Sequence, residues 1–369
     1  MKDEFIIKLT RWRIFLFFAT LAISAQSEEN GISMDDNFIR ASLVIASPGN
    51  VLYSCIGHAF IRMECPTHGL DYCFSYESEG VRQKVLKFLS GNLKMEMMAV
   101  PTDEFLSQYR NKGRSVMEYN LNLSIPQKQK LWELLDNSIE AGVNLPYDYM
   151  ERGCAQSCLR IIEDAITPID TLSFFSWPDY FFMTRRELVR RQMDDYPWNA
   201  LFLYFLVGTE GDRNVSYKEK VVTPTDLLYV FQHASVNGKP MINGSGTELV
   251  AGSGDTTSNS ILSPLGCCLI LLASLLLCIW RGWIVCEVVL LCFQFILGLF
   301  MCYLLFFSSL PCTDWNWLVV PFNPFPLLLW HWRRNWMFSY LVVLIVWLSC
   351  ILLCPHRIVD RPLLILTAQ

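Results

Sequence analysis

The sequence predicts an α+β domain followed by a bundle of membrane-spanning helices. Three short runs between residues 40 and 80, rich in β-branched and aromatic residues, are typical of strands. Apolar residues spaced three and four apart then predict helices over 81–89, 102–109 and 126–139. From Pro264 to Leu310 the sequence holds only two charged residues, which indicates that this part of the chain lies in lipid.

The chain divides into four predicted segments. Residues 1–27 have the layout of a secretory signal, in which basic residues precede an apolar run and small residues follow it; an uncleaved anchor is the alternative. An exported domain is expected over 28–242. Residues 243–263 are rich in Gly, Ser and Thr and predict a flexible linker, and 264–369 are expected to form the membrane domain.

The number of membrane spans is left open between three and four. Two spans are predicted at 264–280 and 284–307, joined by a short cytoplasmic turn at Arg281. The stretch that follows is apolar, but its prolines break any regular helix. Arginines beyond residue 330 support either topology under the positive-inside rule, and we take four spans as the working prediction.

Charge and cysteine content narrow the function classes. The net charge is −5 and no basic stripe with stacking aromatics occurs, so nucleic-acid binding is not expected. Nine of the fourteen cysteines lie after residue 260 in apolar sequence, where cysteine behaves as a small hydrophobe. A disulfide between Cys65 and Cys73 is one option for the exported cysteines. The five exported cysteines are Cys55, Cys65, Cys73, Cys154 and Cys158.

An aromatic stretch beside four arginines, within residues 172–198, has two readings. It fits a surface that dips into lipid headgroups, with aromatic rings at the interface and guanidinium groups on phosphate. It equally fits a core loop followed by a solvated helix.

His58 is the first residue with predicted chemistry. Strand alternation places His58, Phe60, Arg62 and Glu64 on one face, which we expect to be polar, and apolar residues on the other. A histidine with a purely structural role is the alternative.

Cys154 is the second residue with predicted chemistry, because a helix is predicted to start at or just after it. The helix dipole and free backbone N–H groups would stabilise its thiolate, and a nearby imidazole would lower its pKa further. The same N–H groups could hold the oxyanion of a tetrahedral intermediate. Cys158, one turn further on, is the rival nucleophile and is expected to be buried.

Other chemistries fit the sequence less well. A zinc site would need Cys154 and Cys158 together with the scattered His68, Cys65 and Cys73, whereas structural zinc sites have tight ligand spacings. No G-x-S-x-G motif occurs, which disfavours a serine triad. We therefore predict neither a metal nor another cofactor.

Several motifs, taken in order and over most of the chain, resemble the Lnb-type bacterial lipoprotein N-acyltransferases. The motifs are SCIGHAFIRM, FSYESEG, FLSGNLKMEMM, FLSQYRNKGRSVMEYNLNLS, YDYMERGC with a helix after it, GTEGDRNVSYKEKVVTPTDLL and TDWNWLVVPFNPF. The resemblance implies a circularly permuted papain-like (NlpC/P60-like) exported domain, with the histidine before the cysteine. It also implies an enzyme of the bacterial inner membrane whose catalytic domain faces the periplasm.

The resemblance implies a reaction as well. His58 and Cys154 match the family's histidine and cysteine positions. Cys154 would take an acyl chain from a membrane phospholipid as a thioester and pass it to the α-amine of a lipoprotein's diacylglyceryl cysteine. His58 would act first as base and then as acid.

Further site residues are candidates only. Arg62 matches a position that is usually basic in the family, and Arg62, Glu64 and Tyr149 are candidates for substrate binding or support of the site. The group that orients His58 is left open among Glu64, Asp71 and Asp148. Relatives tend to have asparagine at the position of Gly153, so polar assistance from that side chain is in doubt.

Two alternative functions remain. An exported cell-wall cysteine amidase or peptidase would share the fold and the Cys–His pair but has no need of several membrane spans. A membrane sensor could keep the fold without the chemistry. The apolar C-terminal part of the chain favours the acyltransferase.

Overall fold

The computed structural model describes residues 39–49, 54–78, 85–142, 145–148, 152–174, 184–193, 196–213, 215, 221–242, 244–253, 263–310 and 313–328. The predicted signal segment, Tyr149 and any span after residue 328 lie outside these ranges.

The strands are β1 Arg40–Ala46, β2 His58–Cys65, β3 Leu70–Ser78, β4 Lys94–Pro101, β5 Val116–Asn120, β6 Leu145–Pro146, β7 Leu172–Ser173, β8 Ser235–Val236, β9 Lys239–Pro240 and β10 Thr247–Val250. The helices of the exported part are α2 Val85–Leu89, α3 Thr102–Asn111, α4 Ile125–Glu140, α5 Cys154–Ile166, α6 Arg185–Gln192, α7 Pro197–Leu206 and α8 Pro224–His233. The helices that follow are α9 Pro264–Arg281, α10 Ile284–Phe306 and α11 Phe325–Leu328. Short 3-10 turns are η2 Pro66–His68, η3 Thr209–Asp212 and η5 Trp317–Val319.

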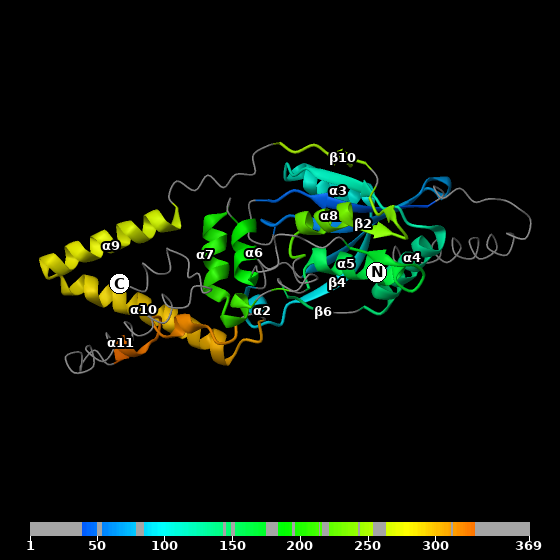
Figure 1. The fold of residues 1–369 in the computed structure, drawn as a ribbon. Coiled ribbons are helices and arrows are strands. Elements are labelled where there is room, and N and C mark those ends of the chain that lie inside the picture. The colour runs from blue at the N-terminus through cyan, green and yellow to red at the C-terminus, as the bar shows by residue number, and fades with distance from the viewer. Residues whose placement is uncertain are drawn as a thin grey trace, which may run out of the picture.

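A seven-stranded antiparallel sheet forms the centre of the part of the chain before α9 (Figure 1). Its strand order is β10-β5-β1-β2-β3-β4-β6, and a smaller sheet contains β7, β8 and β9. The three strands predicted between residues 40 and 80 are confirmed as β1, β2 and β3. Strand β4 was not predicted, although Met95 and Met97 alternate with exposed polar residues as a half-buried strand requires.

Helices cover both faces of this sheet. One face packs against α4, α5 and α8 and carries the main core, in which Leu43, Ile61 and Ile162 are fully buried. The other face packs against α3. The prediction that His58 and Phe60 lie on a polar face is therefore only partly right. Phe60 is fully buried, with its ring centroid 4.8 Å from that of Phe105 on α3.

The predicted helices are confirmed where the structure describes them. Helix α4 starts after Ser124, whose backbone N–H donates to the Gln127 side chain at 2.8 Å in a capping box. Helix α5 starts at Cys154, and the helix predicted over 81–89 is described from Val85 onward.

The predicted linker over 243–263 is partly structured. Its residues Thr247–Val250 form β10, which pairs with β5 at the edge of the large sheet. The short run TELV was not predicted as a strand because its flanks are rich in Gly and Ser. It pairs with the backbone groups of β5, which would otherwise form an open edge of the sheet. Residues 254–262 lie outside the described part of the chain.

The two arginines that open α6 are structural and do not face lipid. Arg185 is buried and donates to Glu210 at 3.3 Å, and Arg186 donates to Asp212 at 2.8 Å. Their partners lie in η3, so this part of the predicted lipid-facing surface belongs to the interior. The aromatic residues 175–180 lie outside the described ranges.

The two helices predicted after residue 263 are present as α9 and α10, with Gly282 between them at φ +68. Among the described residues, Ile284–Phe306 is the one helix that is both long and apolar enough to cross a membrane, and the apolar stretch Pro264–Cys278 is shorter. The chain after α10 forms η5 and α11 and no long helix up to residue 328, as its prolines predict. Whether three or four spans form stays a prediction.

Candidate active site

Cys154 is the first residue of α5, and its position follows from local backbone geometry. Gly153 caps the helix in extended conformation, with φ −74 and ψ 175, and Ser157 N–H donates to Gly153 C=O at 3.0 Å. The first-turn N–H groups of a helix have no partners within it, and the helix dipole is positive at this end. The thiol therefore lies beside donors that can stabilise negative charge.

His58 is the first residue of β2, directly after Gly57. Gly57 has φ +87, a conformation that favours glycine, and a Cβ there would lie 2.9 Å from the Ala46 backbone oxygen. The glycine thus lets the chain turn sharply into β2 beside β1. This turn places the imidazole at the end of the central strand that packs against α5.

The side chains of His58 and Cys154 lie close enough to act on each other's pKa, with a hydrogen bond among the causes. The backbone N–H of Ala59, the next residue on β2, also contributes to lowering the pKa of Cys154. Strand β2 therefore supplies two groups that act on the thiol at the start of α5.

The other side of the imidazole faces β3. His58 Nε2 lies 2.7 Å from Ser75 Oγ and 3.4 Å from Glu77 Oε1, and Ser75 Oγ donates to Glu77 Oε1 at 2.9 Å. Ser75 and Glu77 lie two residues apart on β3, so they share the sheet face of His58.

The electrostatics favour a thiolate–imidazolium pair. Burial alone would raise the pKa of Cys154, but His58 and the Ala59 N–H bring that pKa below its usual value. Burial would lower the pKa of His58, yet Tyr109, Cys154 and Glu77 together raise it well above its usual value. The pKa of Glu77 is lowered by His58 and Ser75 despite its burial. All three shifts favour the charged forms.

Tyr109 on α3 adds a buried phenol to this group. Burial raises its pKa to about 12, so the phenol is neutral at neutral pH. Its ring stacks on Phe60 at 5.9 Å, and the Arg114 guanidinium carbon lies 5.0 Å from its centroid. The negative charges that act on His58 at neutral pH are thus Cys154 and Glu77.

Arg62 and Glu64 are held in a separate ion-pair network. Arg62 donates to both carboxylate oxygens of Asp71, at 2.8 and 2.7 Å, and to both of Glu118 at 3.0 Å. Glu64 pairs with Arg40 at 3.2 Å. Arg62 lies four residues from His58, or about 13 Å along a strand. The structure does not bring these two candidates to Cys154, and strand alternation alone could not show that Arg62 is neutralised.

The candidates for orienting His58 are corrected by the structure. Asp71 is engaged by Arg62 and by Thr102 at 2.5 Å, and Glu64 by arginines. Asp148 is buried in the segment before α5, where its backbone oxygen accepts from the Arg152 N–H at 2.8 Å. Within the described part of the chain, the side chains that contact the His58 ring nitrogens come from Ser75, Glu77 and Cys154.

Within the described part of the chain, Cys55, Cys65, Cys73 and Cys158 form no disulfide. Cys65 and Cys73 face opposite sides of the sheet, one in the main core and one under α3, so the optional bridge between them does not form. Cys158 is buried as expected, and burial raises its pKa. Burial also raises the pKa of Cys55 to about 11 and that of Cys73 to about 12. The pKa of Cys154, by contrast, is lowered.

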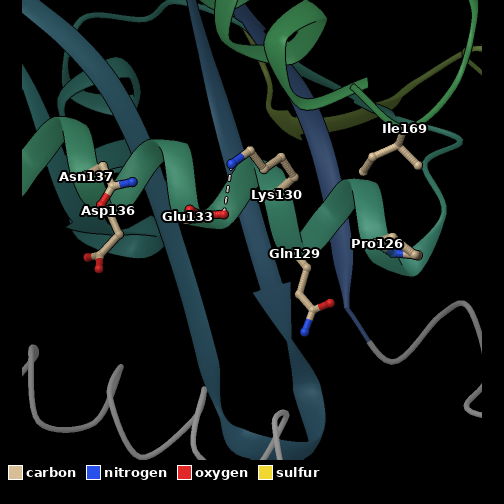
Figure 2. Close-up of a pocket in the computed structure, with 7 residues that line it drawn as sticks. All are labelled: Pro126, Gln129, Lys130, Glu133, Asp136, Asn137 and Ile169. Atoms are coloured by element: carbon tan, nitrogen blue, oxygen red, sulfur yellow. Dashed lines mark hydrogen bonds and ion pairs between the residues drawn. The ribbon is translucent and has the colours of Figure 1, made fainter. Parts of the chain in front are cut away.

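The structure has a surface groove that is separate from this cluster. A surface groove of about 450 Å³ runs along α4 (Figure 2). It is lined by Pro126, Gln129, Lys130, Glu133, Asp136, Asn137 and Ile169, so it contains neither His58 nor Cys154. No group of three or more His, Cys, Asp or Glu side chains in the described ranges is placed to hold a metal ion.

Residues 32–191 match the family model of the Lnb N-terminal periplasmic domain, and this range includes both His58 and Cys154. This part of the chain is therefore similar to the N-terminal periplasmic domain of the Lnb family. The Lnb domain implies an enzyme of the acyltransferase class with lipoprotein substrates. Its periplasmic description, together with α10, is consistent with a membrane-anchored protein that has a periplasmic domain. No curated protein and no solved structure matches the chain significantly.

Proposed function

We propose that this chain is a lipoprotein N-acyltransferase of the inner membrane that works through Cys154 and His58. The observation that carries the proposal is the proximity of these two side chains, at the start of α5 and within the matched Lnb domain. A cysteine on a helix start, packed against a histidine on the central strand of an antiparallel sheet, also supports a circularly permuted papain-like fold.

In the first half-reaction, the Cys154 thiolate attacks the carbonyl carbon of a phospholipid acyl ester. Backbone N–H groups at the start of α5 would hold the oxyanion of the tetrahedral intermediate. As the ester C–O bond breaks, His58 gives its proton to the departing lysophospholipid oxygen. The product is an acyl thioester on Cys154 and a neutral imidazole.

In the second half-reaction, the α-amine of a diacylglyceryl cysteine attacks the thioester. His58 takes a proton from the attacking amine, and the C–S bond breaks as the amide forms. The Cys154 thiolate and the imidazolium are thereby restored, so no cofactor is consumed. The candidate membrane helix α10 supports a lipid substrate, because it would keep the domain beside the bilayer.

The proposal predicts a triacylated product. Full-length protein in phospholipid vesicles, supplied with a diacylated lipopeptide, should add one acyl chain to the peptide amine, as measured by mass spectrometry. Cys154→Ala should abolish the product, while Cys292→Ala, at an exposed position on α10, should retain it.

A wild-type protein that leaves the lipopeptide unchanged and cleaves a cell-wall peptide instead would replace this function with the amidase alternative. Product formation by Cys154→Ala at the wild-type rate would remove the thiol mechanism.

A further inference from the structure

The chain after α10 is held against the exported domain by hydrogen bonds to two helix ends. We call residues 308–310 and 313–328 the bracket segment. Ser309 N–H donates to the Ser90 backbone oxygen at 3.1 Å, next to α2. The Asn316 side chain is buried and donates to the Phe205 backbone oxygen on α7 at 2.9 Å. These bonds satisfy backbone groups at the ends of two helices of the exported domain.

The same segment is held from the other side by α10. Gln294 on α10 donates from its side chain to the Pro321 backbone oxygen at 2.8 Å. A Cβ at Gly298 would lie 2.5 Å from the Asn323 carbonyl carbon, so the segment lies directly against the helix backbone there. The bracket segment therefore contacts both the exported domain and α10.

Gly208, which opens the GTEGD motif, allows the closest approach in this junction. Thr209 N–H donates to the Asp314 backbone oxygen at 3.2 Å, and a Cβ at Gly208 would lie 2.1 Å from that oxygen. The backbone of Gly208 has φ −83, which any residue can adopt, so only the contact requires glycine. The Arg186 side chain stabilises this turn by donating to the Gly208 backbone oxygen at 2.9 Å.

The backbone of Trp315 is strained at this contact, which indicates that the surrounding residues fix its conformation. Trp315, between Asp314 and Asn316, has φ +52 and a side chain that is 74% exposed. A bulky residue in this region of φ is costly and persists where its surroundings fix the backbone. Here the contacts of Asp314 and Asn316 on either side supply that constraint.

An apolar cluster continues from this junction to the candidate site. It includes Met301 and Leu304 of α10, Leu318 of the bracket segment and Leu203 of α7, and it ends at Cys55. Ile56 and Tyr147 pack against the same cluster. Ile56 lies two residues before His58, and the charge of Cys154 contributes to raising the pKa of Tyr147. The packing is therefore continuous from α10 to the turn that carries the imidazole.

We propose that the bracket segment is a positioning element, which holds the Cys154–His58 pair at a fixed distance from the lipid around α10. Gly208 of the exported domain and Asn316 of the bracket segment are the key positioning residues of this contact. The inference rests on the proposed function and adds that bilayer acyl donors depend on this contact, whereas small soluble acyl donors do not. A displacement of about 1 Å in a reacting pair can cost ~10²-fold in rate.

The test compares two acyl donors on full-length protein in detergent or vesicles. The lipid donor is a phosphatidylethanolamine–phosphatidylglycerol vesicle, read out as lysophospholipid release. The soluble donor is p-nitrophenyl butyrate, read out as p-nitrophenolate release. Asn316→Ala and Gly208→Ala should each lower the rate with vesicles by ~10-fold to ~10²-fold and leave the rate with the soluble ester within about twofold.

Asn323→Ala is the matched control, because its side chain donates to Val320 within the bracket segment and does not reach the exported domain. It should leave both rates near wild type. Equal loss of both rates in Asn316→Ala and Gly208→Ala, or no loss with vesicles, would overturn the positioning role. A wild-type protein inactive with both donors would instead count against the proposed function.

Discussion

Replacing His58 with alanine is expected to move the reactivity of Cys154 to higher pH and to slow its acylation by about 10²- to 10⁴-fold. Burial raises the pKa of this thiol, and His58 is the main group that lowers it. Without the imidazole, burial is opposed chiefly by the Ala59 N–H, so the pKa of Cys154 should rise above its ordinary value. The thiolate would then be scarce at neutral pH.

The measurement is the rate of iodoacetamide alkylation of Cys154 against pH, followed by peptide mapping. In wild-type protein the thiolate should persist as the pH falls below the ordinary cysteine pKa, and be lost as the pH falls through the lowered pKa. His68→Ala, at an exposed histidine in η2, should reproduce the wild-type profile. Identical profiles for wild type and His58→Ala would show that the two side chains do not interact.

Replacing Glu77 with glutamine is expected to lower acyl transfer by roughly 10- to 10²-fold, less than loss of the acid–base group itself. Glu77 contacts His58 Nε2 both directly and through Ser75, so its charge contributes to the raised pKa of His58. The imidazolium is present below the pKa of His58 and is lost as the pH rises through it. Removal of the Glu77 charge lowers that pKa, so the upper limit of the ion-pair window should move to lower pH.

The pH profile separates this positioning role from a purely structural one. Glu77→Asp, which keeps the charge, should recover part of the activity and of the upper limit. Glu133→Gln, at an exposed carboxylate on α4 that pairs with Lys130, should change neither. An unchanged upper limit in Glu77→Gln, whatever its activity, would mean that Glu77 does not act on His58.

The residues that meet Cys154 could be predicted only in part from the sequence. The start of α5 at Cys154 and the three strands around His58 follow from local signals, namely helical periodicity and short β-favouring runs. The link between His58 and Glu77 needs the register of β2 against β3. Arg62 pairs with Cys73, and the same register continued along the strands places His58 opposite Glu77. That register could have been derived from the short turn after Cys65.

Contacts between distant segments account for what the sequence did not show. By strand alternation, Arg62 lies on the same face as His58 and could belong to the site. The Glu118 carboxylate, 56 residues further along the chain, binds its guanidinium group instead. The sequence left Arg185 and Arg186 open between a lipid-facing surface and a solvated helix, and the structure pairs them with Glu210 and Asp212 of η3. Likewise, β10 could not be predicted from its Gly-rich surroundings, because it is stabilised by pairing with β5. Charge partners and strand partners of this kind depend on tertiary packing, which local sequence patterns do not encode.

Formation of an acyl thioester on Cys154 from phospholipid alone tests the central claim most directly. Full-length protein is incubated with phospholipid vesicles in the absence of lipopeptide, digested and mapped by mass spectrometry. We expect one fatty acyl group on the peptide that contains Cys154, released by neutral hydroxylamine and matched by lysophospholipid. Wild-type protein with no adduct, or an equal adduct in Cys154→Ala, would contradict the mechanism.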